Sequence, residues 1–536
     1  MGGRLLASAD PTQVAAAPKM TGIQEFVLLG HDEASHDALA RGADVAGFSE
    51  TLLSLFRFQQ TGRAYRILLP VRQRGLGSIH RTFNLAQKVA GARRFDPLPP
   101  FEPRPVARVA ANLDAYLSRM AELARGTPIR IQPDDPALPA LAQHLQGHAS
   151  PENDAELLRL FGLLTEGVYI GPRTFHMDLA NSCNENCAYC WFHSPHSKNR
   201  EDADRFGPEW KRTHIDFDTA RKLVDDLARL GTREDILLTG KGEPLTHPRC
   251  LDIVDYIKSK QMHATLFTNG ILLGPSNLER LHRAGLDLLY VSLSAASHPV
   301  YEALHPGHAG SELEVVRDNL LALQRMKQSS GRPYPRVVMV DVVNHDNAHE
   351  LADFVRWSAA IGADFVRYQL IHVQYYNESL KLTPQDLVRV RAGLAEAKAV
   401  AAAAGMSVME NIDFQLSTLV EDSGAWGRSE LPAEGCFAGW YFSRSWADGT
   451  ISFCCSPKPI ANLDETSFAS LWEGPRYGYY RNAGKHLQAN GRVRFTDGTP
   501  LVNAHCFSCP NYEGLGDARR GLRNFGLERW LGRTVG

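Results

Sequence analysis

The stretch TFHMDLANSCNENCAYC, residues 174–190, joins a strand pattern to a short loop of cysteines. Cys183, Cys187 and Cys190 follow the predicted strand closely, and no fourth cysteine lies nearby. Structural metal sites built from cysteine are closed by a fourth ligand, whereas a reactive site keeps one position open. Three thiols directly after a strand therefore indicate a metal centre with an open position.

The residues after this loop alternate between strand and helix patterns. In residues 216–231, apolar side chains recur at helical spacing, with Asp216 or Asp218 as the expected N-cap and Gly231 as the expected stop. The short connections favour an α/β fold, a parallel sheet curled into a partial (β/α)6 TIM-like barrel. Ligands of such sheets bind at the carboxyl ends of the strands, where the three cysteines would lie. The six predicted strands cover residues 174–180, 235–240, 263–270, 286–295, 335–343 and 363–373.

The uneven distribution of the nine cysteines divides the chain further. None occurs before Cys183, and five lie beyond residue 430, while Cys250 falls on the apolar face of a predicted helix and is expected in the core. Strand patterns at residues 26–30 and 64–71 indicate an N-terminal α+β region. The predicted regions are 1–170 (α+β), 171–380 (barrel core), 381–425 (bridging helix) and 426–536 (small cysteine-rich C-terminal domain).

Composition excludes several classes of protein. The net charge of −2 and the pI of 6.9 leave no basic surplus of the kind that nucleic-acid binding requires. The N-terminus has no apolar core for a signal peptide, and the longest small-apolar run, residues 399–405, is far shorter than the roughly 20 residues of a membrane span. We therefore expect a cytoplasmic protein without nucleic-acid or membrane partners, whose reduced cysteines are metal ligands rather than disulfides.

Three more segments at the ends of predicted strands carry a resemblance. They are TGKGEPLTHP at residues 239–248, FTNG at residues 267–270 and VSLSA at residues 291–295. Together with the C-x3-C-x2-C loop they resemble the radical S-adenosylmethionine (radical SAM) family over residues 174–373. The resemblance implies a [4Fe–4S] cluster whose open iron binds SAM. A zinc knuckle with His193 as fourth ligand is the alternative.

The resemblance also implies which side chains contact SAM. Glu243 would accept hydrogen bonds from the SAM ammonium group, and Tyr189 would lie near the adenine. Two serines would face the ribose and the carboxylate, or they make only strand-end hydrogen bonds. The implied SAM-binding residues are Tyr189, Gly240, Gly242, Glu243, Ser292 and Ser294.

The C-terminal region carries a second cysteine pattern. Residues 435–472 place a cysteine before a hairpin, Asp448-Gly449 at its turn, a cysteine pair after it and a helix ending in Trp472. A C-x-x-C follows at residues 506–509. The order resembles the SPASM or twitch extension of radical SAM enzymes and implies one auxiliary [4Fe–4S] cluster; a structural zinc is the alternative. The implied ligands are Cys436, Cys455 (or Cys454), Cys506 and Cys509.

The N-terminal region bears on the substrate. Residues 134–170 resemble the winged-helix leader-binding module of peptide-modifying radical SAM enzymes, or they form a helical cap over the radical. After the sixth strand, His372, Gln374, Tyr375 and Tyr376 either contact substrate or pack against the next helix.

These patterns lead to one functional prediction. We expect a radical SAM enzyme that abstracts hydrogen from a peptide and receives electrons from a donor such as flavodoxin or ferredoxin. The alternative substrates are small polar metabolites, a sugar or aminocyclitol that is oxidised or epimerised. A metal-binding scaffold without catalysis is the alternative of another class.

Overall fold

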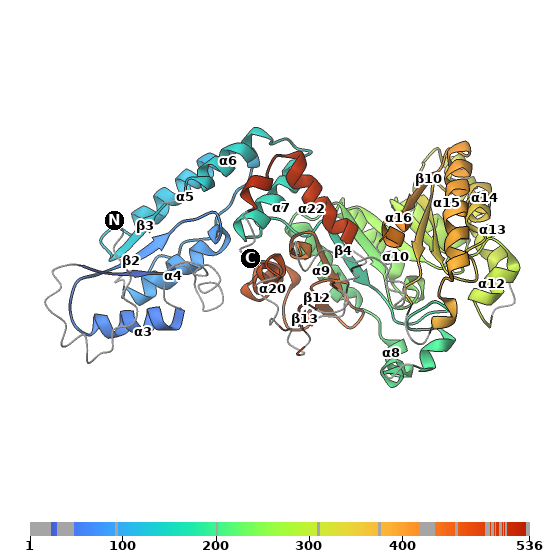
Figure 1. The fold of residues 1–536 in the computed structure, drawn as a ribbon, viewed down its shortest axis with the longest axis horizontal. Coiled ribbons are helices and arrows are strands. Elements are labelled where there is room, and N and C mark those ends of the chain that lie inside the picture. The colour runs from blue at the N-terminus through green and yellow to red at the C-terminus, as the bar shows by residue number, and fades with distance from the viewer. Residues whose placement is uncertain are drawn as a thin grey trace. The chain divides into compact units, whose positions relative to one another are not determined.

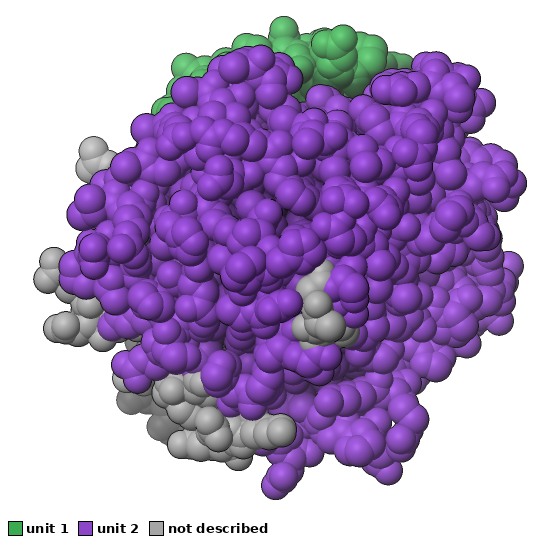
Figure 2. All heavy atoms as spheres, turned by 90° about the vertical axis from the view of Figure 1, so that its right-hand side faces the viewer, with its two compact units in different colours: residues 1–171, 472–489, 513–536 green, residues 172–471, 490–512 purple. Residues whose placement is uncertain are grey.

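The computed structural model describes residues 23–28, 48–91, 95–133, 135–199, 202–307, 311–373, 377–417, 435–455, 459–487, 500–502 and 512–531, with residues 494, 498, 506 and 509. The chain forms two compact units, coloured green and purple in Figure 2. Unit 1 comprises residues 1–171, 472–489 and 513–536, and unit 2 comprises residues 172–471 and 490–512. The region predicted as a separate C-terminal domain, residues 426–536, is thus divided between both units.

Unit 2 is built on a ten-stranded sheet whose central part is parallel (Figure 1). Its six central strands lie side by side in chain order, which confirms the predicted partial barrel. A further parallel strand, β10 (Ser407–Glu410), pairs with the last of them and was not predicted. The six strands are β4 (Thr174–Asp178), β5 (Asp235–Thr239), β6 (Ala264–Thr268), β7 (Leu288–Ser292), β8 (Arg336–Val343) and β9 (Phe365–Leu370).

A hairpin from the C-terminal region extends this sheet at its other edge. Strand β11 (Phe442–Ser445) pairs in parallel with β4, and β12 (Thr450–Ser452) and β13 (Pro459–Asn462) follow antiparallel. Gly449 adopts a φ of 79° at the turn, a left-handed conformation that glycine tolerates without strain. The predicted hairpin is present, but its pairing with the first barrel strand was not foreseen.

The connecting helices are amphipathic, and their apolar sides are buried. In α9 (Phe217–Arg229) the buried residues are those that the spacing predicts, and Asp216 is the N-cap because its carboxylate accepts a hydrogen bond from Thr219 N at 3.0 Å. Cys250, first residue of α10 (Cys250–Ser259), is buried in the core as expected. The other helices of unit 2 are α8 (Pro208–Arg212), α11 (Pro275–Ala284), α12 (His298–Leu304), α13 (Ser311–Ser330), α14 (Leu351–Ala360), α15 (Pro384–Ala403), α16 (Ile412–Ser417) and α18 (Ala438–Tyr441).

The two faces of the sheet differ in what covers them. Tyr368 of β9 donates to the Leu351 carbonyl of α14, so alternate residues of β9 point toward the helices. The neighbouring Phe365 packs instead with Tyr290 and Val338 in a cluster on the opposite side. We call this second side, away from the helices, the inner face.

Unit 1 contains a three-stranded parallel sheet, with β2 (Tyr65–Pro70) between β1 (Gln24–Val27) and β3 (Ile129–Gln132). Within residues 134–170 the described part contains α6 (Ala137–Gly147) and α7 (Asp154–Thr165), without the β-hairpin that a winged helix would have. The remaining helices are α3 (Phe48–Gln59), α4 (Ile79–Val89), α5 (Val109–Leu123), α20 (Pro475–Lys485) and α22 (Tyr512–Asn524), and α19 (Phe468–Glu473) crosses the boundary between the units along the chain.

A buried ionic cluster joins distant segments of unit 1. Glu166, in a left-handed conformation directly after α7, accepts hydrogen bonds from Arg74 at 2.8 Å and from Lys485 at 3.3 Å. Because these cations surround it, the pKa of the Glu166 carboxyl falls far below its usual range although burial opposes ionisation. The cluster fastens the end of α20 to the N-terminal region, so residues 472–489 belong to unit 1.

Candidate active site

The three-cysteine loop begins at Cys183, five residues after β4 ends at Asp178, at the carboxyl edge of the barrel. The Cys183 sulfur accepts a backbone N–H from Glu185, and the Cys190 sulfur accepts N–H groups from Phe192 and His193, each at 3.4 Å. Burial, with some help from the neighbouring sulfurs, raises the pKa of Cys183 to about 12 and that of Cys187 well above its usual value. Close thiols that receive backbone N–H groups suit a metal centre, which would replace their protons.

A buried polar group that sequence reasoning missed lies behind Cys187. Glu185, 2% exposed, accepts from the Tyr301 hydroxyl at 3.0 Å and lies 3.2 Å from His305 Nδ1. That His305 nitrogen is also 3.5 Å from the Cys187 sulfur, and the other ring nitrogen lies 3.1 Å from the Leu293 carbonyl oxygen. The group therefore fastens the loop to α12 and to the end of β7.

The glycine-rich segment is pressed onto the start of the same loop. A Cβ atom on Gly240 would lie 2.6 Å from Ala180 O, and one on Gly242 would lie 2.0 Å from Ser182 O. Backbone hydrogen bonds from Gly242 N to Ala180 O and from Glu243 N to Ser182 O join the two segments. The glycines are thus required by packing between two parts of this chain. Their predicted contact with SAM remains a prediction.

Glu243 is buried and accepts three hydrogen bonds. They come from Leu245 N at 3.0 Å, Thr268 Oγ1 at 2.9 Å and Asn269 N at 2.8 Å. Burial nevertheless raises the pKa of its carboxyl to about 7. Glu243 also caps the short 3-10 helix η5 (Pro244–Thr246). The carboxylate is therefore held firmly at the barrel edge, beside the cysteine loop.

Tyr189 and the two serines meet at the end of β7. The Ser294 hydroxyl accepts a hydrogen bond from Val342 N at 2.9 Å, which is the strand-end role considered above, and its φ is 57°. Tyr189 lies beside Cys187, Ser292 and Ser294, and its hydroxyl oxygen is buried among these side chains. Burial raises the pKa of Tyr189 well above its usual value. The predicted SAM-binding residues and the three cysteines are thus brought to one edge, that of β4 to β7.

The second cysteine group lies along the hairpin and beyond it. Cys436 comes just before α18, Cys454 and Cys455 follow β12, and the Cys506 thiol donates to the Leu501 carbonyl at 3.5 Å. These residues all belong to unit 2, although helix α20 between them belongs to unit 1. The ligand set of this group remains a prediction.

The residues predicted after the sixth strand are only partly described. His372 lies with its ring centroid 5.3 Å from that of Trp191, directly after the cysteine loop. Gln374, Tyr375 and Tyr376 lie outside the described residues.

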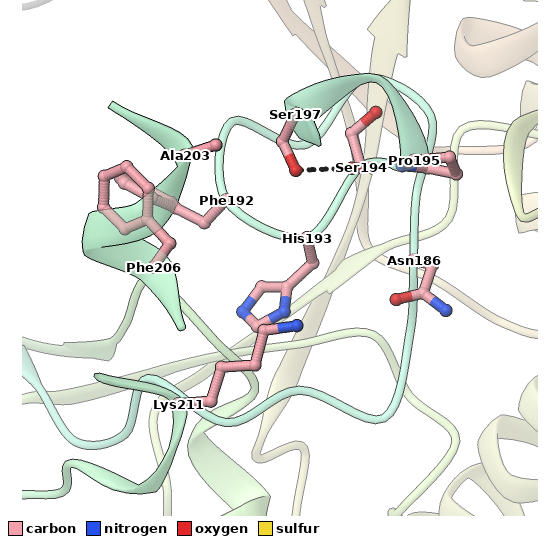
Figure 3. Close-up of a pocket in the computed structure, with 9 residues that line it drawn as sticks. All are labelled: Asn186, Phe192, His193, Ser194, Pro195, Ser197, Ala203, Phe206 and Lys211. Atoms are coloured by element: carbon pink, nitrogen blue, oxygen red, sulfur yellow. Dashed lines mark hydrogen bonds between the residues drawn. The ribbon is translucent and has the colours of Figure 1, made fainter. Parts of the chain in front are cut away.

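A pocket of about 270 Å³ opens beside the cysteine loop (Figure 3). All of its lining residues come from positions 186–211, including Phe192, His193 and Lys211, and none is among the predicted SAM ligands. Phe192 and Phe206 belong to an aromatic cluster with Trp210. The pocket is therefore distinct from the edge where the predicted ligands gather.

The length and apolar character of the helices bear on the prediction that the chain has no membrane span. No helix in the described part of the chain combines the length and the apolar character that crossing a bilayer requires.

A parallel partial barrel with cysteines at the carboxyl edge of its first strand defines an α/β enzyme whose cofactors bind at the strand ends. The family is identified by comparison: residues 177–358 match the model described as "Radical SAM superfamily". The chain thus contains a radical SAM domain and is a radical SAM enzyme. Domains of this superfamily bind SAM and a [4Fe–4S] cluster.

Curated relatives are distant. The chain is 22% identical over 326 residues to the "Tungsten-containing aldehyde ferredoxin oxidoreductase cofactor-modifying protein" of Pyrococcus furiosus, covering 57% of this chain and 82% of the relative. It is 26% identical over 210 residues to the "PqqA peptide cyclase" of Gluconobacter oxydans, covering 39% of this chain and 52% of that protein. Among solved structures, SuiB of Streptococcus suis bound to S-adenosylmethionine has a TM-score of 0.45 at 16% identity, covering 70% of this chain and 80% of that chain.

Proposed function

We propose that this enzyme cleaves SAM reductively and uses the product to abstract a hydrogen atom from a peptide. The observation that carries the proposal is the junction of the three-cysteine loop with the glycine-rich segment, where Glu243 N bonds to Ser182 O at 2.7 Å. A [4Fe–4S] cluster, when bound, supplies the electron that converts SAM to methionine and a 5′-deoxyadenosyl radical. Cys183, Cys187 and Cys190 would hold it, leaving one iron open.

The residues around the loop would bind and orient SAM. Glu243 would accept hydrogen bonds from the SAM ammonium group, because its carboxylate lies at the same edge and is fixed by three donors. The Tyr189 hydroxyl, buried beside Cys187, Ser292 and Ser294, would donate a hydrogen bond toward SAM or a bound water. Ser292, last residue of β7, would face the ribose or the carboxylate.

The substrate class rests on the relatives. Besides the protein of Gluconobacter oxydans, three other curated relatives are named "PqqA peptide cyclase". One comes from Granulibacter bethesdensis and two come from strains of Xanthomonas campestris. This recurrence favours a peptide over a sugar or aminocyclitol. A scaffold without catalysis is disfavoured, since the barrel edge retains both the cysteine loop and a buried carboxylate suited to SAM.

Three further features belong to the proposal. One auxiliary cluster, held by Cys436, Cys455, Cys506 and Cys509, would lie in the C-terminal part of unit 2. A small redox protein such as flavodoxin or ferredoxin would supply electrons, and the enzyme would work in the cytoplasm.

The proposal is tested by anaerobic reconstitution with iron and sulfide, followed by incubation with SAM and dithionite. We expect 5′-deoxyadenosine and methionine in equal amounts. Added flavodoxin with its reductase should replace dithionite. Reconstituted protein that holds a reducible cluster, binds SAM and still releases no 5′-deoxyadenosine would contradict the proposal. Zinc in place of iron at the three-cysteine loop would do so as well.

A further inference from the structure

Lys241 is held at the barrel edge by the two glycines that flank it. Gly240 and Gly242 both pack against the backbone of residues 180–182, so the chain has no freedom to shift at Lys241. The Lys241 ammonium lies 3.8 Å from the ring centroid of Trp446 and 5.6 Å from that of Phe192. Its charge is therefore directed between the cysteine loop and the hairpin by packing, not by an ionic partner.

The buried carboxylate near Lys241 is already paired with another cation. Asp178, fully buried at the end of β4, accepts three hydrogen bonds from Arg444, at 2.7 and 3.0 Å on one oxygen and at 2.8 Å on the other. The Arg444 guanidinium also lies 4.1 Å from the Trp446 ring centroid. Lys241 forms no salt bridge with any carboxylate in the described residues. Burial lowers the pKa of Lys241, although the charge of Asp178 partly opposes this effect.

A second cation without an ionic partner lies on the same inner face. Arg367 of β9 alternates with Tyr368, which points to the helices, so Arg367 points to the inner face. It forms no salt bridge within the described part of the chain and lies near the Tyr290 hydroxyl, whose pKa is raised by burial although the charge of Arg367 opposes this effect. Both arginines act on His176 of β4, whose pKa lies well below its usual value because of burial and the charges of Arg444 and Arg367.

The charges on this face do not balance. Three cations, Lys241, Arg367 and Arg444, face two carboxylates, the buried Asp178 and Asp448 at the exposed hairpin turn, while His176 is neutral. Asp235 lies at the amino end of β5, the far end of the strand, and accepts from Thr265. A partly buried cation is costly unless a negative group pairs with it. Of these cations, Lys241 lies at the carboxyl edge, in the segment that packs against the start of the cysteine loop.

We propose that the inner face binds a carboxylate of the substrate, with Lys241 and Arg367 as the receiving cations and Arg444, held by Asp178, as a fixed neighbour. The inference rests on the proposed function and names its substrate class: a peptide segment that carries an acidic residue near the reacting position. A carboxylate could also come from the methionine part of SAM, and the experiment distinguishes the two sources.

The test compares two capped tripeptides, acetyl-Ala-Glu-Ala-amide and acetyl-Ala-Gln-Ala-amide, which differ in the charge of one side chain. Their affinity is measured by anaerobic calorimetry on the full, cluster-loaded chain with saturating SAM. We expect the Glu peptide to bind about tenfold or more tightly, as a charge-assisted hydrogen bond implies. The preference should disappear in the double variant Lys241→Met/Arg367→Met and persist in Lys241→Arg, which keeps the charge.

Matched controls are Lys222→Met on α9 and Arg391→Met on α15, which remove exposed cations elsewhere. Equal affinities for both peptides, or no binding of either at millimolar concentration, would overturn the inference. So would a tenfold loss of SAM affinity in the double variant with an unchanged peptide preference, because the cations would then serve SAM. Normal release of 5′-deoxyadenosine in any of these cases leaves the proposed function standing, so the two can fail separately.

Discussion

The two cysteine groups of this chain differ in how the rest of the fold holds them. The first loop is attached to two neighbouring parts of the barrel, because Ser182 bonds to Glu243 and Cys187 lies beside His305, and Cys190 accepts two backbone N–H groups from the residues that follow it. The second group follows a hairpin at the sheet edge, and the chain between its members passes through unit 1. A short sequence motif is therefore sufficient to define the first site. The second depends on the path of a long segment.

The largest expected effect concerns the first loop. Replacing Cys183, Cys187 or Cys190 by alanine should reduce release of 5′-deoxyadenosine below detection, since each thiolate would hold one iron of a cubane. Iron content should fall from about eight to about four per chain if two clusters are present. Cys250→Ser is the matched control, because that cysteine lies in the core without a ligand role. Unchanged SAM cleavage in any one of the three alanine variants would remove the distinction between the two groups.

The second group should behave in a complementary way. Cys436→Ala or Cys509→Ala should also cost about four irons, yet SAM cleavage without substrate should persist because the first loop is intact. Cys454→Ala and Cys455→Ala, measured side by side, should identify the ligand as the one whose loss lowers iron. If all four variants keep their iron, or if stoichiometric zinc replaces about half of it, this region holds no auxiliary cluster.

The sequence predicts best what depends on neighbours along the chain. The periodicity of residues 216–231 is sufficient to place the buried side of α9, since a helix repeats every 3.6 residues. The six barrel strands are predicted for the same reason. The motif residues also predict the edge at which they gather, because parallel strands end together.

What the sequence does not predict depends on contacts between distant residues. The pairing of Glu185 with His305 joins positions 120 apart, and no local pattern marks it. The pairing of β11 with β4 and the inclusion of α20 in unit 1 also depend on residues far apart in the sequence. Glu243 combines both cases. The motif predicts that it lies at the barrel edge, but its role as the cap of η5 and its contacts with Thr268 and Asn269 depend on the fold.

A smaller effect is expected at Glu243, which belongs to the well-attached site. Glu243→Gln should weaken SAM binding by about ten- to hundredfold, because a charge-assisted hydrogen bond contributes roughly 1.5–3 kcal/mol. Iron content should be unchanged, since no cysteine is lost. The amide keeps the shape of the side chain, so a melting curve serves as the control for the cap. A lower melting temperature with normal SAM affinity would leave Glu243 a structural residue only.

The smallest expected effect is a pH dependence, and it tests the same carboxyl without changing its shape. The pKa of Glu243 is about 7 in the folded chain, raised by burial from 4.5. Only the ionised form can pair with the SAM ammonium, and the ionised fraction rises from about one tenth at pH 6 to about nine tenths at pH 8. SAM affinity should therefore increase about tenfold over this range in the wild type and stay nearly constant in Glu243→Gln.

The free energy of unfolding without SAM should change in the opposite direction, decreasing as the pH rises. Since the folded state holds this proton more tightly than the unfolded chain, the contribution is complete below pH 4.5 and is lost as the pH rises through 7. Titrating SAM against the iron-loaded protein at pH 6, 7 and 8 measures the first effect, and denaturant unfolding at the same pH values measures the second. If SAM affinity in the wild type does not change with pH, Glu243 does not bind the SAM ammonium group. The carboxylate beside the first cysteine loop would then have no role in SAM binding.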